Sequence, residues 1–301
     1  MKSEPNDICY CPSGRLYKDC HMKLDNAIPE KRVAASHDLY LSDWRITAKH
    51  FQENGYYEWM ASILSTAYPK LVLDIGCGTG EGILELVKRF NCEIISIEEN
   101  LSCIKAASEL LKSNGIEVEP IERLNFDPIP PQNYSYTLSV YPNKLQHKAQ
   151  VTIIQSDWLA SDIELLNFLK VYTFDAVTIW LVGSHRIHSA CIDIPRMKDA
   201  AEYRLIAQNK TYEVADTILR PGGILQVVDR GGEPNTPELV EDVIRSHKDQ
   251  ASVTSLEVFD LQFRPYCEAS NGIPMVLSPG LLGKIGNEHS RALVSICSKK
   301  P

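Results

Sequence analysis

The stretch Leu71–Gly82, LVLDIGCGTGEG, decides the fold of this chain. Its first five residues form a short apolar run that predicts a buried strand. Glycines follow at positions 76, 78, 80 and 82, and they predict a tight turn where a ligand can approach the backbone closely. In the next segment, GILELVKRF, one helical face carries Ile83, Leu84, Val87 and Phe90. Strand, glycine turn and helix together predict a doubly wound α/β fold.

The spacing of the glycines indicates the class of ligand. Dinucleotide enzymes use G-x-G-x-x-G, in which the helix N-terminus receives a pyrophosphate. Here the third glycine comes one step early, at Gly80, and Glu81 already places a negative charge at the start of the helix. That charge would oppose a pyrophosphate, but it would not oppose a zwitterionic ligand with a net positive charge. The spacing therefore disfavours an NAD-type oxidoreductase.

The segment LDIGCGTG resembles the first motif of class I S-adenosylmethionine-dependent methyltransferases. That motif has an acidic residue at the end of the first strand, followed by a GxGxG turn. The resemblance implies a Rossmann-like fold and binding of S-adenosylmethionine. It assigns cofactor contacts to Asp74, Gly76, Cys77, Gly78 and Gly80.

Two later acidic residues fit the same resemblance. The segment 92–100, CEIISIEEN, predicts a second strand ending at Glu98, in the position that holds the ribose hydroxyls in this family. The segment 151–159, VTIIQSDWL, predicts a third strand. There the resemblance assigns Asp157 to the adenine amine and Trp158 to stacking on the ring. From the residues alone, Asp157 could instead cap a helix, and Trp158 could belong to the core.

The rest of the chain completes the expected sheet. Further strands are predicted near 173–183, 219–229, 255–263 and 292–298, with a helix near 236–249. The fold class is therefore α/β, a doubly wound, Rossmann-like sheet of seven strands whose last strand is antiparallel. This domain is expected to span 66–301.

The loop after the fourth predicted strand is the first place to look for catalytic residues. Methyl transfer from a sulfonium is an in-line displacement, and a general base is needed only for some acceptors. His185 and His188 lie in this loop and could act as that base, or they could be solvated histidines without a role. The loop reads IWLVG, without the Asn/Asp-Pro-Pro-Tyr/Phe or Pro-Cys that many nucleic-acid methyltransferases carry. A small-molecule or protein acceptor is favoured over nucleic acid.

Three segments decorate the predicted domain. Residues 26–65 read as helices rich in aromatic residues, Trp44 among them, and could form a lid over the cofactor or simply pack on the sheet. Residues 116–150 form an insertion in which YSYTLSVY could pair with EVEPIERLNF as a hairpin. Residues 264–291 form a long connection that could line the substrate site or bind a partner.

The front of the chain, residues 1–25, contains CYCPSGRLYKDCH, from Cys9 to His21. Two cysteines two apart, a short loop and then adjacent Cys and His residues can wrap a tetrahedral ion, and zinc accepts three cysteines and one histidine. The pattern resembles the SEC-C motif, a small zinc-binding module. The resemblance implies a structural zinc and a possible protein partner, with the ligands Cys9, Cys11, Cys20 and His21.

Composition bounds the remaining possibilities. The net charge of −8 disfavours a protein that grips a long phosphate backbone. No apolar run is long enough for a membrane helix, and the first residues do not resemble a secretory signal, so we expect a cytoplasmic protein without membrane association. Two functions stay open. One is a zinc-containing methyltransferase, and the other is an inactive methyltransferase-like adaptor that acts through the zinc module.

Overall fold

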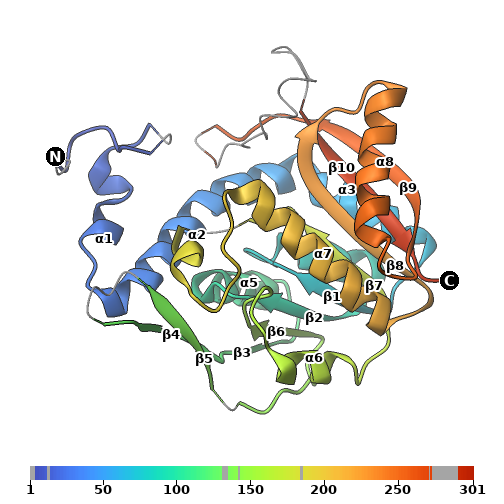
Figure 1. The fold of residues 1–301 in the computed structure, drawn as a ribbon, viewed down its shortest axis with the longest axis horizontal. Helices are drawn as coiled ribbons and strands as arrows, with labels where there is room; N and C mark the ends of the chain where they lie inside the picture. The colour runs from blue at the N-terminus through green and yellow to red at the C-terminus, as the bar shows by residue number, and fades with distance from the viewer. Residues whose placement is uncertain are drawn as a thin grey trace.

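The computed structural model of the chain describes residues 4–11, 14–130, 135–141, 143–183, 186–270, 272 and 291–301. Within that part, a central sheet carries helices on both faces (Figure 1). The chain begins in a small module at the left of the view, beside the long helix α2 (Pro29–Glu53). None of the described helices has the length and apolar character needed to cross a lipid bilayer.

The main sheet has eight strands in the described residues. In spatial order they are β3 (Val118–Ile121), β6 (Val151–Gln155), β2 (Glu93–Glu98), β1 (Leu71–Ile75), β7 (Phe174–Trp180), β8 (Leu219–Gly232), β10 (Arg291–Lys299) and β9 (Glu257–Tyr266). Strand β10 is antiparallel to β8 and β9, and the other neighbouring strands are parallel. The doubly wound, Rossmann-like fold class is confirmed. The sheet has one strand more than the seven predicted, because the start of the insertion pairs with the outer edge of β6.

Two helical layers enclose this sheet. One face packs against α2, α3 (Tyr56–Ile63), α4 (Glu81–Phe90) and α5 (Leu101–Ser113). The other face packs against α6 (Ile163–Leu169), α7 (Ala200–Ile218) and α8 (Pro237–Ala251). Successive strand residues point to opposite faces, so in β1 Val72 joins the first cluster and Leu73 the second. A parallel strand buried on both faces reads as a continuous apolar run, as LVLDI does.

The insertion forms more than the hairpin expected from its sequence. Strands β4 (Leu124–Pro128) and β5 (Tyr136–Val140) pair antiparallel, as predicted, with Phe126 opposite Leu138. Between β3 and β4, the fully buried guanidinium of Arg123 donates to Asp162 and Glu164, each at 2.6 Å. This buried ion-pair network ties the insertion to the start of α6.

The N-terminal region contains the helices expected between residues 26 and 65. After the short helix α1 (Met22–Asp25), α2 and α3 run over the first face of the sheet, and α3 is followed by a 3₁₀ turn at Leu64–Thr66. Pro29 occupies the first turn of α2, where its missing N–H costs nothing. Buried residues of α2, including Trp44 and Phe51, join the main core. This helix therefore lies between the N-terminal module and the carboxyl edge of the sheet.

Candidate functional site

The glycine turn lies at the carboxyl end of β1, where parallel strands of this fold present their ligand site. Gly76, Gly78 and Gly80 all have positive φ, at 80°, 53° and 92°. At Gly80, a Cβ atom would lie 3.0 Å from both Cα and Cβ of Ala107 on α5. Only glycine fits there, because α4 must begin against the neighbouring helix.

Glu98 points to this turn from the end of β2. Its two carboxylate oxygens accept hydrogen bonds from the backbone N–H groups of Gly78 and Asn100, both at 3.0 Å. Burial raises the pKa of Glu98 to about 7, although the backbone donors favour the ionised form. Each oxygen keeps a further lone pair for a ligand hydroxyl.

Asp74 lies deeper, within the sheet. Its carboxylate accepts hydrogen bonds from Thr178 at 2.9 Å and Ser96 at 3.0 Å, and burial raises its pKa to about 6. Cys77 is half-buried in the turn, and burial raises the pKa of its thiol well above the ordinary value. These contacts organise the turn from underneath.

A small cavity lies above the turn, at the ends of β1, β2 and β6. Four of the predicted residues line it: Gly76, Gly78, Glu98 and Trp158. The other predicted contacts, Asp74, Cys77, Gly80 and Asp157, are not among the described residues that line it. The structure thus brings the glycine turn, the acid after β2 and the aromatic residue after β6 to one place.

Two aromatic side chains of α2 close this cavity. A Cβ atom on Gly78 would lie 2.6 Å from Nε1 of Trp44, and one on Gly183 would lie 2.7 Å from the hydroxyl of Tyr40. The two rings stack with centroids 6.5 Å apart. About 40 Å³ of cavity remains, whereas small-molecule sites usually hold several hundred Å³. Sequence analysis included Trp44 in the helical segment but missed Tyr40, for which no local pattern gives a signal.

Trp158 has two environments. Its indole N–H donates to Thr211 at 3.0 Å, and the ammonium of Lys210 lies 5.3 Å from the ring centroid. These contacts anchor Trp158 to α7 and to the core, while part of the side chain lines the cavity. The structure thus shows the core contacts of Trp158 and places part of its side chain in the cavity wall.

Asp157 and His188 meet behind the cavity wall. One oxygen of Asp157 accepts from the backbone N–H groups of Leu159 and Ala160, and the other lies 2.7 Å from Nε2 of His188. Despite burial, hydrogen bonding and the charge of His188 lower the pKa of Asp157 to about 2. Burial alone would lower the pKa of His188, but Glu99 and Asp157 raise it to about 9.

His188 is therefore protonated at neutral pH and is 2% exposed. It is not among the described residues that line the cavity. His185, the other predicted base, lies outside the described residues. The donor atoms of Glu99, Asp157 and His188 lie within 4.8 Å of one another, which is close enough for a metal ion, but the 2.7 Å contact is that of a direct hydrogen bond.

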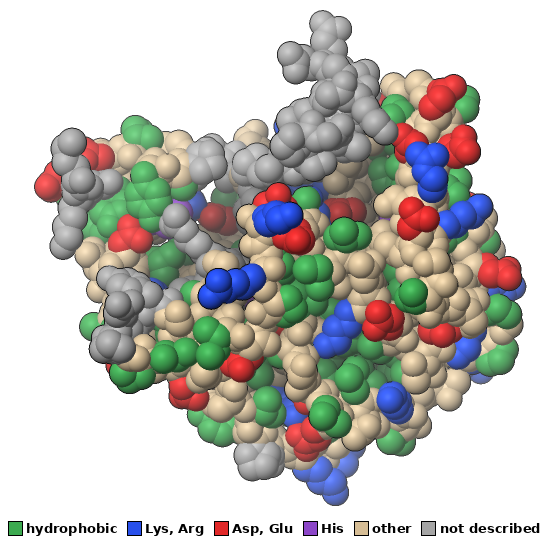
Figure 2. Space-filling model, viewed as in Figure 1, with side chains coloured by type: hydrophobic (Ala, Val, Ile, Leu, Met, Phe, Trp, Pro, Cys, Tyr) green, Lys and Arg blue, Asp and Glu red, His purple; other side chains and the backbone are tan. Residues whose placement is uncertain are grey.

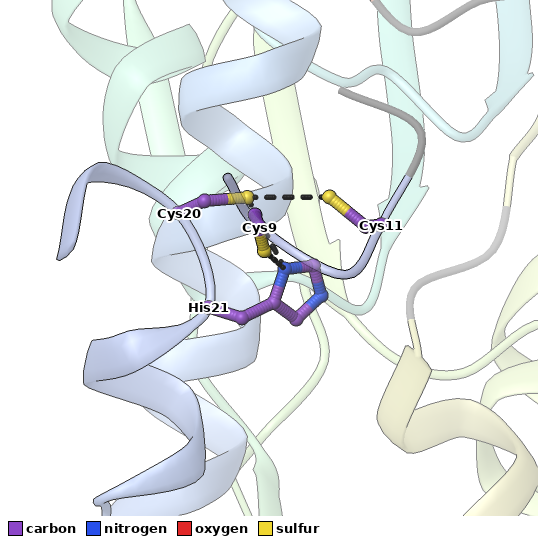
Figure 3. Close-up of side chains that lie close together, drawn as sticks. All are labelled: Cys9, Cys11, Cys20 and His21. Atoms are coloured by element: carbon purple, nitrogen blue, oxygen red, sulfur yellow. Dashed lines mark hydrogen bonds between the residues drawn. The ribbon is translucent and has the colours of Figure 1, made fainter. Parts of the chain in front are cut away.

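The four predicted metal ligands converge in the N-terminal module (Figure 3). Nδ1 of His21 lies 3.3 Å from Sγ of Cys9 and 3.1 Å from Sγ of Cys20, and Sγ of Cys11 lies 3.5 Å from that of Cys20. Ligands of a tetrahedral zinc ion are separated by roughly 3.5 Å, so this donor set fits zinc. The turn is closed by the N–H of Cys9, which donates to the carbonyl of Arg15 at 2.8 Å.

Charged side chains attach the cluster of Cys9, Cys11, Cys20 and His21 to α2. The guanidinium of Arg15 lies 3.4 Å from Sγ of Cys20 and 2.5 Å from the carboxylate of Asp43. Lys23 pairs with Asp38 at 2.6 Å. The module thus contacts the same stretch of α2 that carries Tyr40 and Trp44.

Comparison with known protein families finds a match for the central domain and another for the N-terminal module. Residues 72–155 match the family described as a methyltransferase domain. The chain contains a methyltransferase domain. Residues 6–23, which precede the methyltransferase domain, match the SEC-C motif. No curated protein sequence matches the chain.

Solved structures resemble this methyltransferase along most of its length. The N-methyltransferase NodS from Bradyrhizobium japonicum WM9, in complex with S-adenosyl-L-homocysteine, has 13% identity and a TM-score of 0.49, with 89% of this chain and 98% of NodS covered. A putative sarcosine dimethylglycine methyltransferase from Galdieria sulphuraria has 14% identity and a TM-score of 0.45, with 88% and 98% covered. A geranyl diphosphate methyltransferase has 11% identity and a TM-score of 0.45, with 83% and 79% covered.

Proposed function

We propose that this protein transfers the methyl group of S-adenosylmethionine to a small-molecule or protein acceptor. The observation that carries the proposal is the convergence of the glycine turn and Glu98 on one cavity at the carboxyl edge of the sheet. A buried carboxylate that already orients the turn, and has lone pairs left, suits a ribose diol. The glycines allow the rest of the cofactor to lie directly on the backbone.

The residues around the cavity have separate tasks in this proposal. Glu98 would hold the ribose, and Gly76 and Gly78 would lie under the methionine part. Tyr40 and Trp44 would face the cationic sulfur, which aromatic faces attract. When bound, the cofactor supplies an electrophilic methyl group, and the chain has to align the acceptor with it and exclude water. His188 is held by Asp157 and protonated, so we assign it a supporting role in place of the general base.

The segment α2 acts as a lid in this proposal. The remaining cavity cannot admit a ligand the size of S-adenosylmethionine while Tyr40 and Trp44 lie on Gly183 and Gly78. Cofactor entry therefore requires these side chains, or α2 itself, to move. The acceptor would then meet the methyl group near the ends of β7 and β8.

The acceptor class rests on the distribution of surface charge and on the loop after β7, whose sequence IWLVG lacks the motifs that many nucleic-acid methyltransferases carry. Lys and Arg side chains are interspersed with Asp and Glu on the face seen in Figure 2. A long phosphate backbone is better bound by a continuous basic surface. We therefore favour a small-molecule or protein acceptor, and we place the protein in the cytoplasm, where its nine cysteines, none of them in a disulfide, stay reduced.

We also propose that the SEC-C module holds one structural zinc ion through Cys9, Cys11, Cys20 and His21. Among the described residues of the module only a small cluster of side chains packs together, so the metal would supply most of its folding free energy. A closed set of four protein ligands leaves no position for activating water. The module remains a candidate site for a protein partner.

Calorimetric titration with S-adenosylhomocysteine tests the cofactor site. We expect micromolar binding by the wild-type protein and a loss of about 10- to 100-fold in Glu98→Ala, because a charged hydrogen-bond acceptor is removed. Glu117→Gln, which changes an exposed acid outside the cavity, is the matched control and should bind normally. Absence of binding by the wild-type protein would reject the proposal and favour the adaptor function.

A further inference from the structure

A second cavity lies between the carboxyl end of β8 and helix α8, at the end of the sheet where β8, β9 and β10 lie side by side (Figure 1). Its volume is about 470 Å³, within the range of roughly 300–1,000 Å³ that small-molecule sites usually hold. Apolar side chains from β8, α8 and β10 form part of its wall: Val227, Leu239, Val243 and Val294. Of the residues of α8, only Ala251 is buried, so the apolar side of this helix is not packed closely on the sheet. The space between helix and sheet can therefore hold a small ligand.

This second cavity adjoins the proposed cofactor site. Leu181, which lines the cofactor cavity, donates its N–H to the carbonyl of Val228 at 2.8 Å. The next residue along β8 is Asp229, which lines the second cavity. Helix α7 also connects the two, because Tyr203 lines the cofactor cavity and Arg204 pairs with Asp229 at 3.0 Å. The end of the second cavity that contains Asp229 is therefore the end next to the cofactor site.

The wall of the second cavity carries more negative than positive charge. Among the described residues, its charged groups are four carboxylates and two guanidinium groups: Asp229, Glu233, Asp242 and Asp249, with Arg230 and Arg245. Even with Arg204, which pairs with Asp229 from outside the wall, the carboxylates outnumber the guanidinium groups. Burial lowers the pKa of His247, which also lines the cavity, to about 4, so this ring is neutral at pH 7. The wall therefore favours a positively charged ligand over a neutral or negative one.

His247 adds a fixed polar group to this wall. Its Nδ1 lies 3.1 Å from the hydroxyl of Tyr212, and that hydroxyl lies 3.1 Å from the hydroxyl of Ser298. Tyr212 and Ser298 are fully buried, so they hold the imidazole from within the core. The second ring nitrogen, Nε2, has no hydrogen-bond partner among the described residues. A ligand in this cavity can therefore be held by charge at Asp229 and by a hydrogen bond at His247.

We propose that the second cavity binds the methyl acceptor, and that this acceptor is a small amine with an apolar body. The inference rests on the proposed function, because it concerns the substrate of the same reaction. The apolar wall holds the body, and Asp229 attracts the ammonium group to the end next to the cofactor. The ammonium releases one proton to solvent through the half-buried Asp229 carboxylate, and the nitrogen lone pair then forms a bond to the methyl carbon. The carbon–sulfur bond breaks, and its electron pair stays on the sulfur, which becomes neutral.

Methyl transfer from labelled S-adenosylmethionine by the full zinc-loaded chain tests this inference. The small molecules of a cell extract are separated at neutral pH into a pool that a cation exchanger retains and a pool that it does not retain. Label is expected in the retained pool, which contains the amines. Label in the unretained pool or in protein, with none in the retained pool, would overturn the inference and leave the proposed function intact. No label in either pool or in protein would overturn both.

Substitutions then assign the transfer to this cavity. Leu239→Trp fills part of it and should lower transfer to a dilute retained pool by about 10-fold or more, while the Kd of S-adenosylhomocysteine stays within about twofold. Val240→Trp adds the same ring to the next residue of α8, outside the described lining, and should transfer normally. Asp229→Asn should lower transfer by about 10-fold, because the charge that attracts the ammonium is lost. Glu241→Gln, at an exposed acid of α8, should not. Full transfer by folded Leu239→Trp or folded Asp229→Asn would overturn the assignment.

Discussion

Glu98 is buried, although the proposed binding of a ribose diol requires its negative charge, and its burial should appear in the pH dependence of stability. Burial raises its folded-state pKa to about 7, above the ordinary value near 4.5. The stabilisation that follows from protonation is full below pH 4.5 and is lost as pH rises through 7. Glu98→Gln removes this titration. Between pH 5 and 8, the free energy of unfolding should therefore fall by about 2 kcal/mol more in the wild-type protein than in the variant.

Urea unfolding of both proteins at the two pH values measures this difference. Asp74, with a pKa of about 6, titrates in the same interval in both proteins, and because its charge also raises the pKa of Glu98, the measured difference includes the coupling between the two acids. Equal changes in the two proteins would contradict the burial of an ionisable Glu98. Above pH 7 the ionised carboxylate should bind a ribose diol more tightly, so cofactor affinity and stability have opposite pH dependences.

In the proposed function the element that controls access is α2, whose aromatic side chains cover the glycine turn. Trp44→Leu should enlarge the cavity and increase the association rate constant for S-adenosylhomocysteine several-fold, while it destabilises the fold by about 2–3 kcal/mol. Stopped-flow binding and urea unfolding measure the two effects. Trp59→Leu removes the same ring from α3, outside the cavity lining, and should leave the association rate unchanged. Equal rates in wild type and Trp44→Leu would exclude the lid.

The insertion depends on a single buried cation at the junction of β3, β4 and α6. Arg123→Met leaves Asp162 buried without its charged partner, so we expect a loss of about 3–5 kcal/mol in the free energy of unfolding. Arg89→Met breaks the more exposed pair with Glu58, 3.6 Å apart, and should cost less than about 1 kcal/mol. Similar losses in the two variants would show that the buried network does not hold the insertion.

The elements differ in how far their sequence predicts them. The strand, glycine turn and helix at 71–90 follow from local periodicity and spacing, and the acid after β2 follows from the repeat of the same unit. The sequence predicted VEPI as part of a hairpin arm, but its parallel pairing with β6 escaped prediction, because β6 follows later in the chain and no local pattern marks the contact. Tyr40 over Gly183, and His188 against Asp157, join distant segments whose local patterns carry no signal for the contact.

In the whole molecule, the proposed zinc module and the proposed lid meet on one helix, α2. Arg15 contacts both Cys20 of the metal cluster and Asp43 of α2. We expect one zinc ion per wild-type chain and none in Cys20→Ser, measured by elemental analysis. Cys267→Ser, at an exposed cysteine outside the cluster, should keep its zinc. A native protein without zinc would contradict the metal site.

Removal of zinc should have a graded effect along the chain. Hydrogen exchange is expected to accelerate strongly in residues 14–25, to a smaller extent around 38–44 of α2, and not in the central strands. This order follows from the contacts of Arg15 and Lys23 with α2. Unchanged exchange in α2 would mean that the module and the lid are independent.

The central claim is methyl transfer from a cofactor held by the glycine turn and Glu98. It is tested most directly by incubating the zinc-loaded protein with methyl-labelled S-adenosylmethionine and fractionated cell extract. We predict that label enters a small-molecule or protein fraction with the wild-type chain and that Glu98→Ala strongly lowers this transfer when the cofactor is below saturation. Tight binding of S-adenosylhomocysteine with no label in any fraction would contradict the claim and identify the chain as a cofactor-binding adaptor.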